Sequence, residues 1–359
     1  MDRAMGLSWG RNKPARRFLP IVLPWLAAIF YLLTQIHGRA LSPKLERFEF
    51  CQGHMGTQFR MILYANSAAG AQAAAETAFT RIAQLDLMMS DYLEDSELTA
   101  VGRQASGPPI PVCEELFRVL KKSQVMSKRS QGAFDITVGP VVQLWRRARR
   151  TAELPDPARL SEAMALTGHR KMHLYEQTRS VRLAQSGMRL DLGGIAKGYA
   201  ADEAIVLLKK RGITRALVAA GGDIVVAEAP PGTEGWVIGV ASLNSQDEPS
   251  ACHLLLRHSA VSTSGDAEQH VTIGGIRFSH IINPKTGMAL TGRRRVTVVA
   301  RDGITADALA TALCVMGSVR GLQLIETTSG AAAQFEEESE TGKRTTISRR
   351  WSAFPKSCP

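Results

Sequence analysis

Asp307 and Thr311 lie four residues apart in a stretch, residues 307–316, whose apolar spacing predicts a helix. We expect Thr305 to cap this helix and Gly317 to end it. Residues four apart share one helix face, so the carboxylate and the hydroxyl would point the same way. Such oxygen ligands hold Mg²⁺ and leave positions for water and phosphate. An Asp that only favours the positive helix end, with a Thr that only packs, gives the same pattern.

A glycine-rich turn in residues 188–204, MRLDLGGIAKGYAADEA, is the second feature suited to phosphate binding. We expect a strand over residues 188–192 and a helix over residues 196–211. The glycines let a ligand approach the backbone, the helix start offers N–H groups to a phosphate, and Lys197 adds a positive charge. The spacing is neither the Walker A pattern nor G-x-G-x-x-G. A tight strand–helix turn without a ligand would use the same glycines.

Two further segments carry hydroxyl and imidazole groups. Residues 262–266, STSGD, predict a hydroxyl-rich turn. His280 lies in residues 279–287, SHIINPKTG, where a predicted strand passes into an Asn-Pro turn. Junctions between strands and loops often carry catalytic bases, and histidine titrates near neutral pH. A purely structural histidine is the alternative reading.

The predicted strands and helices that carry these groups begin at about residue 45. Residues 68–89 have the spacing of a helix, and residues 132–150 start irregularly and then become helical. Residues 216–228 predict two strands joined by a Gly-Gly turn. Further strands are predicted over residues 59–65, 235–242, 254–264, 277–282, 293–300 and 345–354, with a hairpin after Gly330. Segregated strands and helices favour an α+β fold over a doubly wound parallel sheet.

Composition and charge restrict the class of protein. The chain has 359 residues, 45% of them hydrophobic and 21% charged, which is ordinary for a globular protein. Its net charge is +11, of which residues 1–40 contribute +5. The mildly basic remainder suits an anionic ligand such as a dinucleotide, or a phospholipid surface. A basic stripe with interleaved aromatics, as nucleic-acid binding needs, is absent from the sequence.

The five cysteines do not suggest a zinc site or a disulfide framework. No two form C-x-x-C, none is spaced with His as zinc ligands are, and the number is odd. Cys314 falls within the apolar helix and is expected in the core. One disulfide bridge remains open if the chain is exported.

Residues 1–40 have the form of an export segment. A basic stretch precedes residues 18–34, FLPIVLPWLAAIFYLLT, which carry no charge. Two prolines and the short length suit a signal better than a full membrane span. Gly38 and Ala40 supply small residues for cleavage after Ala40, and residues 16–19, RRFL, partly resemble a twin-arginine signal. Cleaved signal and retained anchor both stay open, and both place the body on the periplasmic side of the inner membrane.

Eight motifs, in order between residues 51 and 354, resemble those of the ApbE family, the FAD:protein FMN transferases. They are GHMGTQF, SDYLEDSEL, GAFDITVGPVVQLW, LDLGGIAKGYAAD, AAGGDIVV, STSGD, HIINPKTG and TADALATAL. The resemblance implies a single α+β, ApbE-like (T-fold-like) catalytic domain over residues 41–359, with mixed sheets and flanking helices. It also implies FAD as substrate, Mg²⁺ as cofactor, and transfer of the FMN half to a Thr or Ser hydroxyl with release of AMP.

The resemblance also assigns roles to residues. The Mg²⁺ ligands would be Asp307, Thr311 and the backbone carbonyl of Gly194, and His280 would be the base for the incoming hydroxyl. Positions that match flavin-nucleotide contacts are Met55, Tyr92, Ala133, Phe134, Asp135, Asp191, Lys197 and Ile281. Position 310 departs from the pattern, because it is Ala where some members carry a second Asp beside the metal.

The implied partner is a target flavoprotein with a motif like [DS]-x-x-[ST]-G-A-[ST], typically a membrane-linked electron-transfer protein facing the outside. Two other functions are compatible with the same residues. One is a Mg²⁺-dependent FAD pyrophosphatase, in which water replaces the protein hydroxyl. The other is a non-catalytic flavin carrier or maturation factor, although a binder needs neither a base nor a metal.

Overall fold

The computed structural model describes residues 45–240, 243, 252–266, 269–339, 342–354 and 356–357. These residues belong to one contact unit, Leu45–Pro359. The predicted export segment, residues 1–40, lies outside the described residues, so that expectation stays a prediction.

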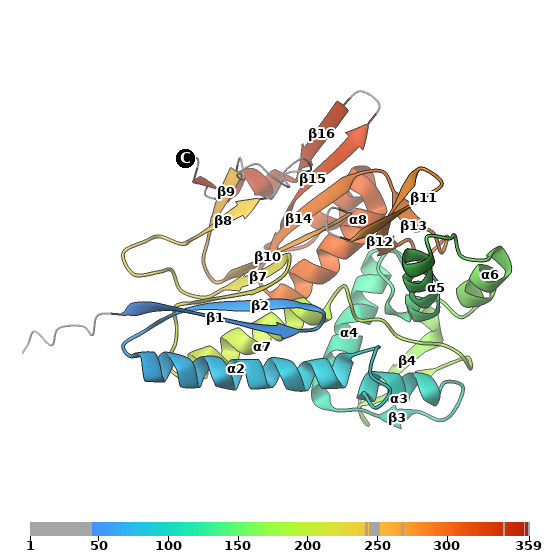
Figure 1. The fold of residues 1–359 in the computed structure, drawn as a ribbon, viewed down its shortest axis with the longest axis horizontal. Helices are drawn as coiled ribbons and strands as arrows, with labels where there is room; N and C mark the ends of the chain where they lie inside the picture. Colours follow the sequence, from blue (N-terminus) through green and yellow to red (C-terminus); the bar gives the residue numbers. More distant parts are fainter. Residues whose placement is uncertain are drawn as a thin grey trace, which may run out of the picture. The chain divides into compact units, whose positions relative to one another are not determined.

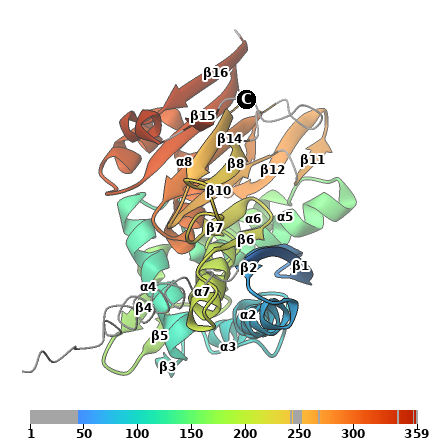
Figure 2. The same ribbon diagram turned by 90° about the vertical axis from the view of Figure 1, so that its left-hand side faces the viewer.

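An eight-stranded sheet forms the centre of the unit, and each of its described neighbouring strands pairs antiparallel. In spatial order the strands are β1 (Glu46–His54), β2 (Thr57–Ala65), β6 (Ala216–Ala220), β7 (Asp223–Val226), β10 (Ser259–Gly265), β14 (Arg294–Ala300), β15 (Ala332–Ser339) and β16 (Gly342–Ile347). In both views the sheet runs from β1 beside α2 to β16 at the other end (Figure 1 and Figure 2). An antiparallel sheet confirms the predicted α+β class.

Three smaller sheets surround it. The first contains, in spatial order, β3 (Ile110–Pro111), β5 (Ser180–Leu183) and β4 (Met172–Tyr175). The second contains β17 (Lys356–Ser357), β9 (Cys252–Leu256) and β8 (Trp236–Val240). The third contains β11 (His270–Ile273), β12 (Ile276–Ile282) and β13 (Ala289–Thr291).

Seven α-helices occur in the described residues. They are α2 (Ala68–Met89), α3 (Glu97–Arg103), α4 (Glu114–Arg129), α5 (Gly139–Thr151), α6 (Pro157–Ala165), α7 (Ala196–Lys210) and α8 (Gly303–Glu326). Short 3₁₀ turns cover Ile136–Val138, His169–Lys171 and Arg349–Ala353.

The central sheet is covered on both faces. One face packs against α2, α7 and α8, and the other packs against the sheet β8–β9. Strand β14 contributes side chains to the core on each face. Val296, Val298 and Ala300 belong to the core on the helix side, whereas Val299 belongs to the core between the central sheet and β8–β9. Side chains of a strand alternate between faces, so a strand buried on both sides carries apolar residues at nearly every position.

Helix α8 differs from its prediction at both ends. Asp302, not Thr305, is the N-cap, and its carboxylate accepts a hydrogen bond from the Thr305 N–H at 2.9 Å. Gly317 leaves helical geometry (φ 73°, ψ 171°), yet a second helical stretch follows to Glu326. The Arg294 guanidinium donates to the Cys314 carbonyl at 2.6 Å, which satisfies an acceptor freed by this kink.

Helix α8 is also the one described helix long and apolar enough to cross a membrane, with a mean hydropathy of 1.5. Most of its apolar side chains are buried against the sheet and α7, and Cys314 is 1% exposed. We therefore interpret α8 as a core helix, in agreement with the predicted burial of Cys314.

Four strand or turn predictions were wrong. Residues 188–192 form no strand, residues 254–264 are two strands in different sheets, and residues 262–265 belong to β10 rather than to a turn. Residues 345–354 end as the 3₁₀ turn Arg349–Ala353 instead of continuing as a strand. These errors share a cause, because strand pairing depends on distant partners that local patterns do not reveal. The hairpin after Gly330 is confirmed as β15–β16.

Candidate active site where α7 meets α8

A lysine and two buried carboxylates meet where α7 lies against α8. The Lys197 ammonium, in the first turn of α7, lies 2.9 Å from Asp223 Oδ2 and 3.7 Å from Asp307 Oδ2. Asp223 begins β7 and is 4% exposed, and Asp307 lies in the second turn of α8 and is 2% exposed. Buried carboxylates need such partners, because removing a charge from water is costly.

The electrostatics of this cluster follow from burial. Burial raises the pKa of Asp307 to about 7, repulsion from Asp223 adds to the rise, and Lys197 opposes it. For Lys197, burial lowers the pKa, but attraction to Asp223 and Asp307 outweighs it and the net pKa is raised. Lys197 is therefore a permanent cation, and Asp307 gains from any further positive charge placed beside it.

The turn before α7 lies directly against α8. A Cβ atom at Gly194 would lie 2.8 Å from Thr311 Oγ1, and one at Gly198 would lie 2.8 Å from the Asp307 Cβ. The Gly198 N–H donates to Asp307 Oδ2 at 3.1 Å. Glycine at both positions thus lets the two helices approach closely enough to bring Gly194, Asp307 and Thr311 together.

These oxygens suit a hard cation. Asp307 supplies a carboxylate, Thr311 a hydroxyl on the same helix face, and Gly194, which packs against Thr311, a backbone carbonyl. No three His, Cys, Asp or Glu side chains cluster as metal ligands within the described residues. A cation held here would therefore depend on a single carboxylate and on oxygens from the bound ligand.

A second charged group surrounds Asp191. Its Oδ1 accepts from the Gly193 N–H at 2.8 Å, and its Oδ2 accepts from Arg146 at 2.8 Å. Arg146 also contacts Asp91 at 2.5 Å and lies over the Tyr92 ring, 4.1 Å from the ring centroid. Burial raises the pKa of Asp191, as does Asp91, while Arg146 opposes both.

Tyr92 is 74% exposed, although Arg146 covers one face of its ring. Its open face is free to stack on a planar ligand.

Met55 occupies the turn between β1 and β2, where Met55 and Gly56 both have positive φ (49° and 71°). This is the backbone of a tight two-residue hairpin turn. The Met55 N–H donates to Asp86 Oδ2 of α2 at 2.7 Å, which fixes the turn against the helix.

Ala133, Phe134 and Asp135 are buried, at 1%, 3% and 7% exposed. Asp135 caps the turn Ile136–Val138, and its second carboxylate oxygen accepts from the His169 N–H at 2.7 Å. In this structure the Asp135 side chain therefore holds two loops together, and contact of this segment with a ligand would come mainly from its backbone.

His280 lies near the end of β12 at a position exposed for the residue as a whole, although the surrounding protein partly desolvates its ring. Its Nδ1 lies 3.1 Å from the Gln269 carbonyl, which leaves Nε2 without a partner among the described residues. Desolvation lowers the His280 pKa, and the positive charges of Arg149 and Lys197 act in the same direction. The neighbouring Ile281 is 6% exposed and belongs to the main core, so it positions β12 by packing.

The structure thus places the Lys197 ammonium 3.7 Å from Asp307 and packs Gly194 against Thr311 of the same helix. Lys197 is also among the charges that act on His280. The remaining predicted residues are held elsewhere. Met55 contacts Asp86, Asp135 contacts His169, and Asp191 contacts Arg146. Sequence reasoning missed Asp223, Arg146 and Asp86. Only Asp223 carried a signal, since a carboxylate directly follows a Gly-Gly turn.

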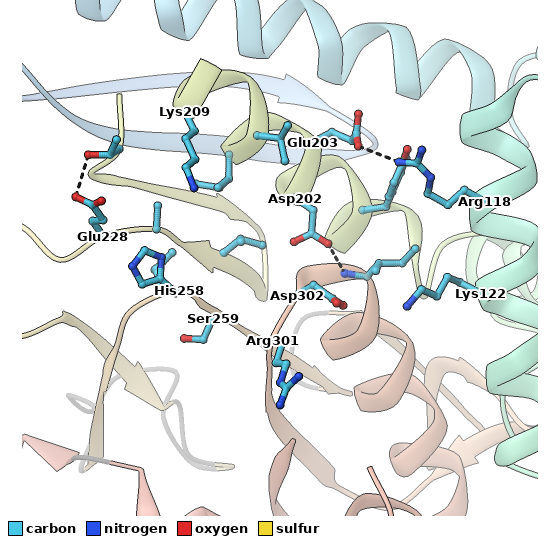
Figure 3. A pocket seen from close by; sticks show the side chains of 18 residues that line it. Arg118, Lys122, Asp202, Glu203, Lys209, Glu228, His258, Ser259, Arg301 and Asp302 are labelled. Atoms are coloured by element: carbon cyan, nitrogen blue, oxygen red, sulfur yellow. Dashed lines mark hydrogen bonds and ion pairs between the residues drawn. The ribbon is translucent and has the colours of Figure 1, made fainter. Parts of the chain in front are cut away.

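A cavity of about 420 Å³ lies farther along α7 and contains none of the predicted site residues. It is lined by later residues of α7, the start of α8 and the end of β7. Figure 3 shows Asp202 pointing toward the start of α8, where its carboxylate accepts from the N–H groups of Gly303 at 2.7 Å and Ile304 at 2.9 Å. Burial raises the Asp202 pKa to about 7.

The family model described as the ApbE family matches residues 55–335, which is most of the chain. The chain belongs to the ApbE family. A relative from Treponema pallidum, named FAD:protein FMN transferase, is 34% identical over 313 residues, covering 83% of this chain and 86% of the relative. Another of the same name, from Vibrio cholerae, is 33% identical over 242 residues, covering 66% of this chain and 72% of the relative.

Solved structures agree with this family assignment. The flavin transferase ApbE from Vibrio cholerae superposes with a TM-score of 0.79 at 27% identity, covering 87% of this chain and 100% of that protein. The ApbE protein from Thermotoga maritima gives a TM-score of 0.77 at 28% identity, covering 86% and 99%. The predicted ApbE-like fold is confirmed.

Proposed function

We propose that this ApbE-family chain is an FAD:protein FMN transferase. It binds FAD, transfers the FMN half to a Thr or Ser hydroxyl of a target protein, and releases AMP. A phosphoester to the target hydroxyl forms while the pyrophosphate bond of FAD breaks. The observation that carries the proposal is the buried contact of Lys197 with Asp223 and Asp307 at the α7–α8 junction, in a chain whose relatives bear this name.

Mg²⁺ is the proposed cofactor, held by Asp307, Thr311 and the Gly194 carbonyl. When bound there, it would neutralise charge on the pyrophosphate oxygens. The fit rests on the donor set and on the raised pKa of Asp307, which reports a buried carboxylate short of positive charge. Lys197 contributes a fixed positive charge to the same phosphates.

His280 is the proposed base. A base must be neutral to take the proton of the incoming hydroxyl, and the lowered pKa of His280 keeps the ring neutral at pH 7. Its Nδ1 faces the Gln269 carbonyl and so carries the ring proton, which leaves Nε2 as the atom that accepts.

The flavin nucleotide would lie along the remaining predicted positions. We assign stacking on a ring of FAD to the open face of Tyr92, and polar contacts to Met55, Asp135 and Asp191. The buried Ala133, Phe134 and Ile281 contribute by packing that positions the backbone for these contacts. Arg146 joins this group, because it fixes both Tyr92 and Asp191.

The target is proposed to be a membrane-linked electron-transfer flavoprotein with a motif like [DS]-x-x-[ST]-G-A-[ST]. We also propose that the catalytic domain, residues 41–359, acts on the periplasmic side of the inner membrane after export through residues 1–40. The basic, uncharged and small-residue stretches of that segment support this location.

Mass spectrometry of a target protein tests the function. The purified chain is mixed with FAD, Mg²⁺ and a protein carrying the target motif, with and without EDTA. We expect the target to gain the mass of FMN less water only when Mg²⁺ is free, and the Asp307→Ala variant to give no gain. FAD cleaved to FMN and AMP without any gain would identify a pyrophosphatase instead, and FAD that stays intact would favour the carrier function.

A further inference from the structure

Asp223 and Asp307 are fixed carboxylates on two different elements, and the flexible Lys197 side chain lies between them. The Gly198 N–H of α7 donates to Asp307 Oδ2 and so fixes this carboxylate of α8. Asp223 is held on β7 by the Ser262 hydroxyl, which donates to its Oδ1 at 2.5 Å from the directly opposite position of β10. The lysine stem has several rotatable bonds, so the two carboxylates compete for one ammonium.

The Lys197 ammonium lies closer to Asp223 than to Asp307. The ammonium lies 2.9 Å from Asp223 Oδ2 and 3.2 Å from the Gly193 carbonyl, both hydrogen-bonding distances. Its distance to Asp307 Oδ2 is 3.7 Å, too long for a good hydrogen bond. The lysine is thus drawn away from the carboxylate that is proposed to bind the cation.

The position of Asp223 is set by its turn and by its neighbour. Gly221 has a positive φ of 61°, and a Cβ at Gly222 would lie 2.7 Å from the Thr263 carbonyl oxygen. The turn therefore holds β7 tightly against β10, and the Ser262 bond orients the carboxylate. These contacts hold Asp223 on β7, so it can act as a tether for Lys197.

We propose that Asp223 is a positioning residue that tethers Lys197 away from Asp307 and so keeps the cation position beside Asp307 open. Without the tether, the ammonium closes on Asp307 as its remaining carboxylate partner. Lys197 and the divalent cation then compete for the same oxygen. This inference rests on the metal site of the proposed function and adds to it a residue that acts through Lys197.

Binding of Mn²⁺ to the full chain tests the tether without any measurement of activity. Free Mn²⁺ is measured by electron paramagnetic resonance during titration of the protein, and FAD binding is followed separately by quenching of flavin fluorescence without metal. We expect Asp223→Asn to weaken Mn²⁺ binding at least tenfold and to change metal-free FAD binding less than threefold.

The double variant Asp223→Asn with Lys197→Met decides between a tether and a simple charge effect. If Asp223 acts by holding Lys197, loss of the ammonium restores Mn²⁺ affinity to within threefold of the Lys197→Met single variant. If Asp223 attracts the cation directly, the double variant binds Mn²⁺ more weakly than Lys197→Met by the same factor that separates Asp223→Asn from wild type, and the tether is refuted. Unchanged Mn²⁺ affinity in Asp223→Asn also refutes it.

Asp202→Asn is the matched control, since it removes another largely buried carboxylate between α7 and α8 that does not contact Lys197. We expect its Mn²⁺ affinity to equal that of the wild type. Thermal unfolding of each variant separates lost binding from lost folding. A wild-type chain that binds no Mn²⁺, while still transferring FMN, would overturn the metal site and the tether together but leave the transfer function standing.

Discussion

Gly198 of α7 and Gly303 of α8 meet backbone to backbone. A Cβ atom at Gly198 would lie 2.2 Å from the Gly303 carbonyl oxygen, and one at Gly303 would lie 2.4 Å from the Gly198 carbonyl oxygen. This contact sets the spacing of the two helices, and with it the distance between Lys197 and Asp307. It also makes the helix junction sensitive to a single methyl group.

Gly198→Ala should therefore destabilise the fold and disrupt the site. The new Cβ would collide with backbone that cannot move independently, and overpacking of this kind costs about 1–3 kcal/mol. Chemical denaturation measures the change in the free energy of unfolding, and the transfer assay should show a loss of at least tenfold. Gly53→Ala is the control, because no atom lies within 4 Å of a Cβ there. Equal stability of the two variants would contradict the role given to this contact.

His280→Ala should abolish transfer but spare FAD binding. Loss of a general base costs about 10²–10⁴-fold in rate, whereas the ring lies at an exposed position and adds little to stability. His173→Ala, at an exposed position of β4, serves as control. Full transfer by His280→Ala would show that another group takes the proton.

The rate of transfer should fall as the pH is lowered through a midpoint below the ordinary histidine value of 6.5. His280 must be neutral to act, and desolvation lowers its pKa. A pH–rate profile in wild type gives this midpoint directly. A limb centred well above 6.5 would assign the titration to a different group.

Asp202 should make stability depend on pH. Its folded-state pKa of about 7 is raised above the ordinary value of 3.8, so its stabilising contribution is present below pH 3.8 and is lost as the pH rises toward 7. The free energy of unfolding of wild type relative to Asp202→Asn should therefore decrease across this range. Glu153→Gln, at an exposed loop position, is the control. A difference independent of pH would mean that Asp202 is ionised throughout.

Arg146→Lys should weaken FAD binding more than it slows transfer at saturating FAD. A lysine cannot span Asp91 and Asp191 with one planar group, nor cover the Tyr92 ring in the same way. We expect about tenfold weaker FAD binding by fluorescence quenching, and a rate at saturation within threefold of wild type. Arg147→Lys, on the exposed side of the same helix, should change neither.

Local signals predicted the elements of the site well. The bounds of α2 match the predicted residues 68–89, and α7 ends one residue before the predicted Arg211. The strands around the Gly-Gly turn also form as predicted. In each case the decisive interaction, a cap or a tight turn, lies within a few residues of the pattern that reveals it.

Distant contacts were not predictable in the same way. Arg146 joins Asp91 and Asp191, which lie 55 and 45 residues away in sequence. No periodicity in one sequence encodes such pairs, so the charged groups that orient the site emerge only from the fold.

The long sequence separation between parts of the proposed site has a consequence for folding during synthesis. Met55 lies in the first hairpin, and Thr311 lies 256 positions later in α8. A nascent chain that has not yet reached α8 lacks the surface against which Gly194 and Gly198 pack. Contacts of such long sequence separation form late in folding. Under the proposed function, FAD binding therefore requires a chain that has been synthesised through α8, because Gly194 and Gly198 lack their packing partner before then.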